Sequence, residues 1–350
     1  MKISYWRNIA GSVLFWQSKV RSINSSRVIM TGTKNMEVTS TSRAIMTAAK
    51  KMEVTSTSTE TWPVCTCCRE MHSVEDGQEV NVSFAGCGFL GIYHLGVLRC
   101  FLTHGKPMLH KVKRWGGASA GALAAASIIC IPNKLDEALG LMNTLISDVQ
   151  GKPLGPLTPG YNMMNTLRSQ LEKILPPNAH SLASGRLFLS ATCITDRKNV
   201  LLSEFDTREE LIQALLCSCY IPVYCGYTMP TYRGKKYIDG GLTQNMPTFS
   251  SGSTVCISPF SGPLQQICPN DNPWYQNLYG IVAGHSFQIN TQNIVRGFQA
   301  LFPPNHDILE GYNRLGWDDA LEFLRKHGYT ESEESESDDD EEVDSDLELE

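Results

Sequence analysis

A serine between two glycines stands near the first third of the chain, in Gly117-Ala-Ser119-Ala-Gly121. This GxSxG pattern is typical of a nucleophile elbow, in which the serine sits on a sharp strand-to-helix turn and small neighbours let the backbone bend. The helix that follows would point its amide dipoles toward the serine oxygen and toward any oxyanion formed there. The segment predicts Ser119 as a nucleophile, with Gly117 and Gly121 shaping the elbow.

A second glycine-rich segment, Gly86-Cys-Gly-Phe-Leu-Gly91, precedes the serine motif. GxGxxG between a strand and a helix can bind a dinucleotide, but that use needs an acidic residue about 20 residues further on. Residues 106–116 contain no acidic residue, and their charged residues are all Lys or Arg. The alternative is an oxyanion hole, in which the amides near Cys87 and Gly88 face a tetrahedral intermediate. A GxSxG after the next strand favours this second use of Gly86, Cys87, Gly88 and Gly91.

A third segment, Asp239-Gly240-Gly241, supplies a candidate base. Alone, Asp-Gly-Gly would be an ordinary turn, but at the end of a predicted strand the carboxylate could project toward Ser119. The eight histidines stand in no motif suited to a catalytic triad, and each is more simply a core or surface residue (His72, His94, His104, His110, His180, His285, His306 and His327). A Ser119–Asp239 dyad is therefore the better hypothesis.

The elements that must position these motifs alternate between strands and helices. Residues 80–85 read as a strand, and the glycine loop and a helix over 92–104 follow it. A strand over 111–115 leads into the elbow and an Ala-rich helix to about Ile131, which Pro132 stops. This βαβ order predicts an α/β domain with a largely parallel sheet.

Further elements follow the serine helix. Helices are predicted over 135–149, 162–175, 211–219 and 318–327, and Thr207 and Glu210 form a capping box for the third of them. Residues 187–195 and 200–205 bracket a hairpin, one strand ends at Asp239, and another covers 254–258. Residues 115–133 carry no charge and could pass for a membrane span, but the glycines at one end and Pro132 at the other favour a buried elbow and helix.

The charge of the 350-residue chain is distributed unevenly. The formal net charge is −6, but residues 1–61 carry +6, residues 62–330 carry +1 and residues 331–350 carry −13. A hydrophobic content of 42% excludes a wholly disordered chain, and nothing in the folded part indicates nucleic-acid binding. We expect a basic, disordered arm over 1–61, a linker over 62–78, a catalytic domain over 79–328 and a disordered acidic tail over 329–350.

The N-terminal arm carries a tandem repeat, because twelve of sixteen positions agree between residues 27–42 and 43–58. Its apolar run at 9–16 is far shorter than the roughly 20 residues that span a bilayer. A mitochondrial transit peptide, a membrane-surface anchor and a non-functional extension all remain open. The 12 cysteines do not have the spacing of zinc ligands, so we expect no metal. We expect them to be reduced thiols in an intracellular protein.

The motifs in this order resemble the patatin-like phospholipase domain family. The segments SFAGCGFLGIYHLG, GASAGAL, LTPGYNMM, IPVYCG, YIDGGLTQNMP and ISPFSG are similar to its adipose triglyceride lipase and adiponutrin branch, and most of all to a short member of that branch. The resemblance covers about residues 79–328. It implies a three-layer α/β/α fold, Ser119 as nucleophile, Asp239 as proton acceptor, the Gly86–Gly91 loop as oxyanion hole, and no cofactor.

The resemblance also implies a neutral-lipid ester hydrolase, for triacylglycerol or retinyl esters, with transacylase activity as a variant. It implies a membrane or lipid-droplet surface and an α/β-hydrolase-type coactivator as partners, and a location in the cytoplasm. The basic N-terminal arm leaves the mitochondrion as an alternative location. Met163, Met164 and residues 221–229 are candidate pocket linings. Plant patatins have a basic residue where Leu90 stands, and long relatives continue into an apolar droplet-binding region where this chain turns acidic.

Two other classes stay open. One is a lipid-droplet or coactivator-binding scaffold with little turnover, against which the intact Ser119 and Asp239 argue. The other is a nicotinamide-dependent oxidoreductase, which the missing acidic ribose partner disfavours.

Overall fold

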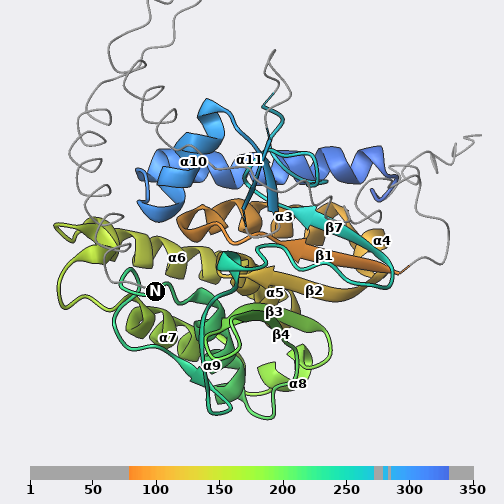
Figure 1. Ribbon diagram of the computed structural model, residues 1–350. Helices are drawn as coiled ribbons and strands as arrows, with labels where there is room; N and C mark the ends of the chain where they lie inside the picture. The colour runs from red at the N-terminus through yellow and green to blue at the C-terminus, as the bar shows by residue number, and fades with distance from the viewer. Residues whose placement is uncertain (1–78, 272–278, 283–284, 331–350) are drawn as a thin grey trace, which may run out of the picture. The chain divides into compact units, whose positions relative to one another are not determined.

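A mixed sheet forms the centre of the computed structural model, which describes residues 79–271, 279–282 and 285–330 (Figure 1). Within these residues the strand order is β5-β6-β3-β2-β1-β7, and β4 also pairs with β3. The strands are β1 Val80–Phe84, β2 Val112–Ala118, β3 Leu187–Cys193, β4 Lys198–Leu202, β5 Thr231–Tyr232, β6 Lys235–Asp239 and β7 Ser253–Ile257.

Four consecutive strands of the sheet are parallel. β7, β1, β2 and β3 pair in parallel, whereas β4 and β6 run antiparallel to β3. Every residue of β1 and β7 is buried, as expected for parallel strands covered on both faces. The prediction of an α/β domain with a largely parallel sheet is confirmed.

Helices flank the sheet (Figure 1). In this view α3, α10 and α11 lie above the strands, and α7, α8 and α9 lie below them. The helices are α3 Gly91–His104, α4 Lys106–Leu109, α5 Ala120–Cys130, α6 Leu135–Gln150, α7 Met163–Ile174, α8 Ala179–Ala183, α9 Arg208–Cys219, α10 Thr291–Leu301 and α11 His306–Lys326. α11 packs along α3, where the Tyr93 hydroxyl donates a hydrogen bond to the Asp319 carboxylate at 2.6 Å.

Most expected elements are present within one or two residues of their predicted bounds. The uncharged stretch over 115–133 is indeed strand, elbow and helix, and no helix in the described ranges combines the length and apolar character that crossing a membrane requires. The last helix begins at His306, twelve residues before the predicted start. α10, the short α4 and α8, and the two-stranded ribbon of β8 Tyr279–Val282 and β9 His285–Gln288 were not predicted.

The predicted capping box of α9 forms in a modified way. The Thr207 hydroxyl accepts from the Glu210 amide at 3.1 Å, as expected. The Glu210 carboxylate accepts from the amide of Asp206 and not from that of Thr207, at 2.9 Å. Arg233 donates to both Asp206 and Glu210, at 2.8 Å each, and so holds the two acidic side chains together.

Tyr329, one residue past the predicted end of the domain, packs on α11. Tyr329 is buried and its ring stacks on Phe323 with centroids 6.4 Å apart. The predicted arm, repeat, linker and almost all of the acidic tail lie outside the described residues, as do Cys65, Cys67 and Cys68.

Candidate active site

The strand register brings the serine and the aspartate motifs together. Ala118, the last residue of β2, pairs with Ser190 of β3, and Asp239, the last residue of β6, pairs with the next residue, Ala191. β4 occupies the other edge of β3 over these positions. Because β2 and β6 run in opposite directions along the same edge, their carboxyl ends meet there. Ser119 and Asp239 therefore lie close together although 120 positions separate them in the sequence.

Ser119 occupies a strained turn. It is the N-cap of α5 and has φ 53° and ψ −125°, in the region that side chains other than glycine seldom adopt. Such a residue costs about 1–3 kcal/mol unless its surroundings hold it. Here the Ser119 amide donates to the Ser218 hydroxyl at 3.1 Å, and that hydroxyl donates to the Ser190 carbonyl at 2.7 Å. This chain of two hydrogen bonds fixes the elbow against β3.

The Asp239 carboxylate is a buried hydrogen-bond acceptor with an altered pKa. It is 3% exposed and accepts from the Gly241 amide at 2.7 Å, and the Ser119 side chain is close enough to favour its ionised form. Burial raises the pKa of Asp239 from 3.8 to about 6, and the nearby Ser119 hydroxyl and Gly241 amide offset part of that rise. A carboxylate with this pKa is ionised at neutral pH and close to the range in which general bases act well.

The glycine loop is held in place by Asn245. The Gly86 amide donates to Asn245 Oδ1 at 3.0 Å, and Asn245 Nδ2 donates to the Gly86 carbonyl at 3.4 Å. The Gly91 amide donates to the Gly88 carbonyl. With the Gly86 and Gly91 amides used in this way, the amides of Cys87 and Gly88 are the candidates for binding an oxyanion.

A cavity of about 390 Å³ opens at the serine. Of the predicted site residues, Gly86, Cys87, Gly88, Gly91, Ser119, Asp239 and Gly241 all line it. Gly117, Gly121 and Gly240 do not, and they support the elbow and the aspartate turn from behind. The volume falls in the range typical of ligand pockets, which is roughly 300–1,000 Å³.

The cavity wall is mainly apolar. Met163 and Met164 line it, as expected, and from the predicted segment 221–229 so do Ile221, Tyr224 and Cys225. Side chains of α5, α6 and α7 complete the wall (Leu123, Leu141, Met142, Leu145, Leu167, Leu171 and Ile174). Such a wall fits a long hydrocarbon chain better than a polar metabolite.

His94 lies near the loop but not in the cavity. Its Nε2 lies 2.8 Å from the Ala85 carbonyl oxygen, and burial lowers its pKa to about 4. It is therefore neutral and packs edge-on against Phe84, as expected of a core histidine. The nine described cysteines are all free, and the described residues contain no cluster of three or more side chains able to hold a metal ion.

Three positioning residues were not predicted. Asn245 and Ser218 act through contacts with residues 159 and 99 positions away in the sequence, and Ser190 takes part through its backbone carbonyl. Only Asn245 had a local signal, because it follows the Asp-Gly-Gly motif by a few residues.

Comparison with known proteins identifies the family of the chain. The family description "Patatin-like phospholipase" matches residues 82–250. Human patatin-like phospholipase domain-containing protein 4 is 42% identical over 254 residues, which are 73% of this chain and 100% of that protein. Rat patatin-like phospholipase domain-containing protein 2 is 41% identical over 71% of this chain and 51% of its own length.

Human omega-hydroxyceramide transacylase is 42% identical over 70% of this chain and 46% of its own length. The chain thus matches about half the length of these last two relatives. Among solved structures, VipD from Legionella pneumophila has 14% identity and a TM-score of 0.32 over 71% of this chain and 67% of that one, too low to infer a shared fold. The full-length match at 42% identity is sufficient: the chain belongs to the patatin-like phospholipase domain family, a family of lipid acylhydrolases.

Proposed function

We propose that this protein hydrolyses carboxylic esters of neutral lipids, such as triacylglycerol or retinyl esters, through a Ser119–Asp239 dyad. The observation that carries this proposal is that the strained Ser119 and the buried Asp239 line the same apolar cavity. Asp239 accepts the hydroxyl proton as Ser119 Oγ attacks the ester carbonyl, and the Cys87 and Gly88 amides bind the oxyanion.

The second half of the reaction uses the same groups. Asp239 gives its proton to the departing alkoxide, and an alcohol and an acyl-enzyme result. Asp239 then accepts a proton from water, which attacks the acyl-enzyme, and the fatty acid leaves as Ser119 regains its proton. When an alcohol replaces the water, the product is a new ester. The similarity to a transacylase supports this variant of the same chemistry.

A fluorophosphonate probe tests the proposal at its central step. The probe should label the wild-type protein at Ser119, and a panel of triacylglycerol, retinyl ester and phospholipid substrates should then identify the preferred ester. Folded protein that shows no labelling would instead support a scaffold with little turnover.

The pH profile of kcat/KM should report the Asp239 carboxylate. Protonated Asp239 cannot accept the Ser119 proton, so kcat/KM should fall about ten-fold per pH unit below a pKa of about 6 and be level above it. A soluble ester measured between about pH 4.5 and 8 would give the profile.

Asp319 offers a matched control for this profile. Burial also raises the pKa of Asp319 to about 6, but its partner is Tyr93 and it does not line the cavity. Asp319→Asn should keep the acidic limb, provided that unfolding is excluded at each pH. A limb near 4 in the wild type would contradict the raised pKa of Asp239.

Asn245→Ala should lower kcat by roughly 10- to 100-fold with little change in KM, because precise positioning of oxyanion donors acts mainly in the transition state. The substitution removes both hydrogen bonds that hold the Gly86 peptide. Steady-state kinetics on a soluble ester would separate the two constants. An equal rise in KM at constant kcat would assign Asn245 to substrate binding instead.

A further inference from the structure

Helix α10 presents its apolar side to solvent and its polar side to the protein. Ile294, Val295 and Phe298 are exposed by 41%, 45% and 37%, whereas Asn293 and Arg296 are each only 6% exposed. This is the reverse of the usual arrangement for a surface helix, whose apolar stripe faces the core. Such an exposed apolar patch is typical of a surface that binds a partner.

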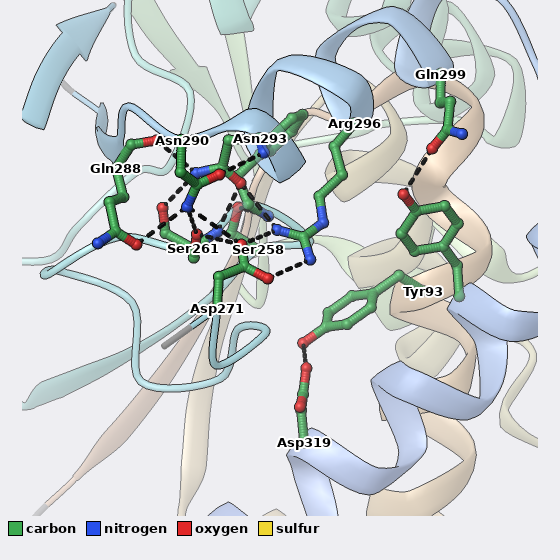
Figure 2. Close-up of polar contacts among 12 residues, drawn as sticks. Tyr93, Ser258, Ser261, Asp271, Gln288, Asn290, Asn293, Arg296, Gln299 and Asp319 are labelled. Atoms are coloured by element: carbon green, nitrogen blue, oxygen red, sulfur yellow. Dashed lines mark hydrogen bonds and ion pairs between the residues drawn. The ribbon is translucent and has the colours of Figure 1, made fainter. Parts of the chain in front are cut away.

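A buried polar network holds α10 in this orientation (Figure 2). Arg296 donates two hydrogen bonds to the Asp271 carboxylate. The bond from Nη2 to Oδ1 is 2.8 Å long. Asn293 Nδ2 donates to the Ser261 carbonyl at 2.8 Å, and Asn293 Oδ1 accepts from the Ser261 amide at 3.1 Å. Asn290 caps the helix by accepting from the Asn293 amide at 2.7 Å.

These bonds fix the rotation of the helix about its axis. Turning the apolar side inward would carry Arg296 away and leave the mostly buried Asp271 carboxylate without its partner, which is destabilising. The exposure of Ile294 and Val295 is thus imposed by the fold. It does not depend on a loosely held segment.

The exposed side adjoins the cavity that contains Ser119. Gly297, Ala300 and Leu301 of the same helix line that cavity, and the Tyr224 hydroxyl donates to the Leu301 carbonyl across it. Leu242, which also lines the cavity, is itself 48% exposed. Apolar surface therefore continues from α10 to the cavity that would receive the substrate.

The charge of the helix indicates the kind of partner. Arg296 is the one ionisable residue of α10, and it points inward to Asp271 (Figure 2). The exposed side offers only apolar and uncharged polar groups, such as Thr291 and Gln292. Such a side matches an uncharged lipid surface, and it offers no ionic contact to a charged protein partner.

We propose that the exposed side of α10, formed by Ile294, Val295 and Phe298, docks the protein on an uncharged lipid surface and brings the cavity to its substrate. This inference rests on the proposed ester hydrolysis. It assigns the attachment to the folded domain itself, so neither the basic arm nor anionic lipid is required.

Flotation with triolein droplets coated with zwitterionic phosphatidylcholine tests the docking directly, with the full chain. Ile294→Ser should weaken droplet binding several-fold, and Ile294→Ser with Val295→Ser should weaken it roughly 10- to 100-fold. Ile194→Ser is the matched control, because Ile194 is 38% exposed on the β3–β4 hairpin and does not line the cavity. It should bind like the wild type.

Turnover of a water-soluble short-chain ester separates docking from catalysis. All variants should retain wild-type turnover of that ester, while the double variant should lose turnover of droplet triolein. Equal flotation of the double variant and the wild type, or no flotation of the wild type, would overturn the docking proposal and point to a protein partner or another segment of this chain. If the double variant lost flotation as expected but neither it nor the wild type turned over any ester, the docking proposal would stand and only the proposed hydrolysis would be overturned.

Discussion

Ser119→Ala and Asp239→Asn should each lower kcat/KM for a lipid ester by roughly 10⁴-fold or more. The alanine variant has no oxygen to form the acyl-enzyme. The asparagine variant keeps the size and the hydrogen bond from Gly241 but cannot accept the Ser119 proton. Because the two groups act as one unit, the double variant should be scarcely slower than either single one.

Two controls make these losses interpretable. Ser147→Ala alters an exposed serine on α6, outside the cavity, and should leave kcat/KM within about two-fold of the wild type. Asp319→Asn likewise removes a different, half-buried carboxylate, the partner of Tyr93. If Asp239→Asn kept activity within ten-fold of the wild type while folded, another group would have to take the proton.

The three motifs could be located from sequence because each has a local signature. Glycines around Ser119, a glycine loop after a strand, and an aspartate before two glycines are visible within six residues each. Their meeting depends on the register of β2 and β6 along β3, where Ala118 and Asp239 pair with neighbouring residues. No local pattern encodes that register, which is set by long-range packing.

The same distinction explains the missed positioning residues. Ser218 lies on the buried side of α9 and resembles any small core residue until its contact with the Ser119 amide is known. Asn245 could be read as a loop residue. Polar contacts between segments 99 or 159 positions apart follow from the fold and not from local propensity.

Helix α10 and the first half of α11 escaped prediction for two physical reasons. α10 has its polar residues inside, so a search for an inward apolar stripe fails there. The first half of α11 contains Gly311 and Gly316, which lower helix propensity. Gly316 nevertheless lies in the helix, where a Cβ would approach the Tyr93 carbonyl to 2.1 Å, so close packing on α3 explains its presence.

Gly121→Ala should destabilise the protein by about 3 kcal/mol and disturb the elbow at the same time. A Cβ at Gly121 would lie 2.2 Å from the Phe84 carbonyl oxygen and 2.7 Å from that of Ala85. Both contacts are with backbone at the end of the central strand β1, which has no freedom to yield, so overpacking of this kind lies at the upper end of its usual range. Urea unfolding followed by circular dichroism would measure the loss.

Gly140→Ala is the matched comparison, because it makes the same change in a helix without the close approach. Gly140 lies in α6 with no atom within 4 Å of the added Cβ, so alanine should stabilise the protein by about 0.5–1 kcal/mol through the lower entropy of the unfolded chain. Opposite signs for the two substitutions would show that helix propensity is overruled at Gly121 by its contact with β1. The GxSxG glycine would then be required by packing as well as by the bend at Ser119, and a stabilising Gly121→Ala would contradict both roles.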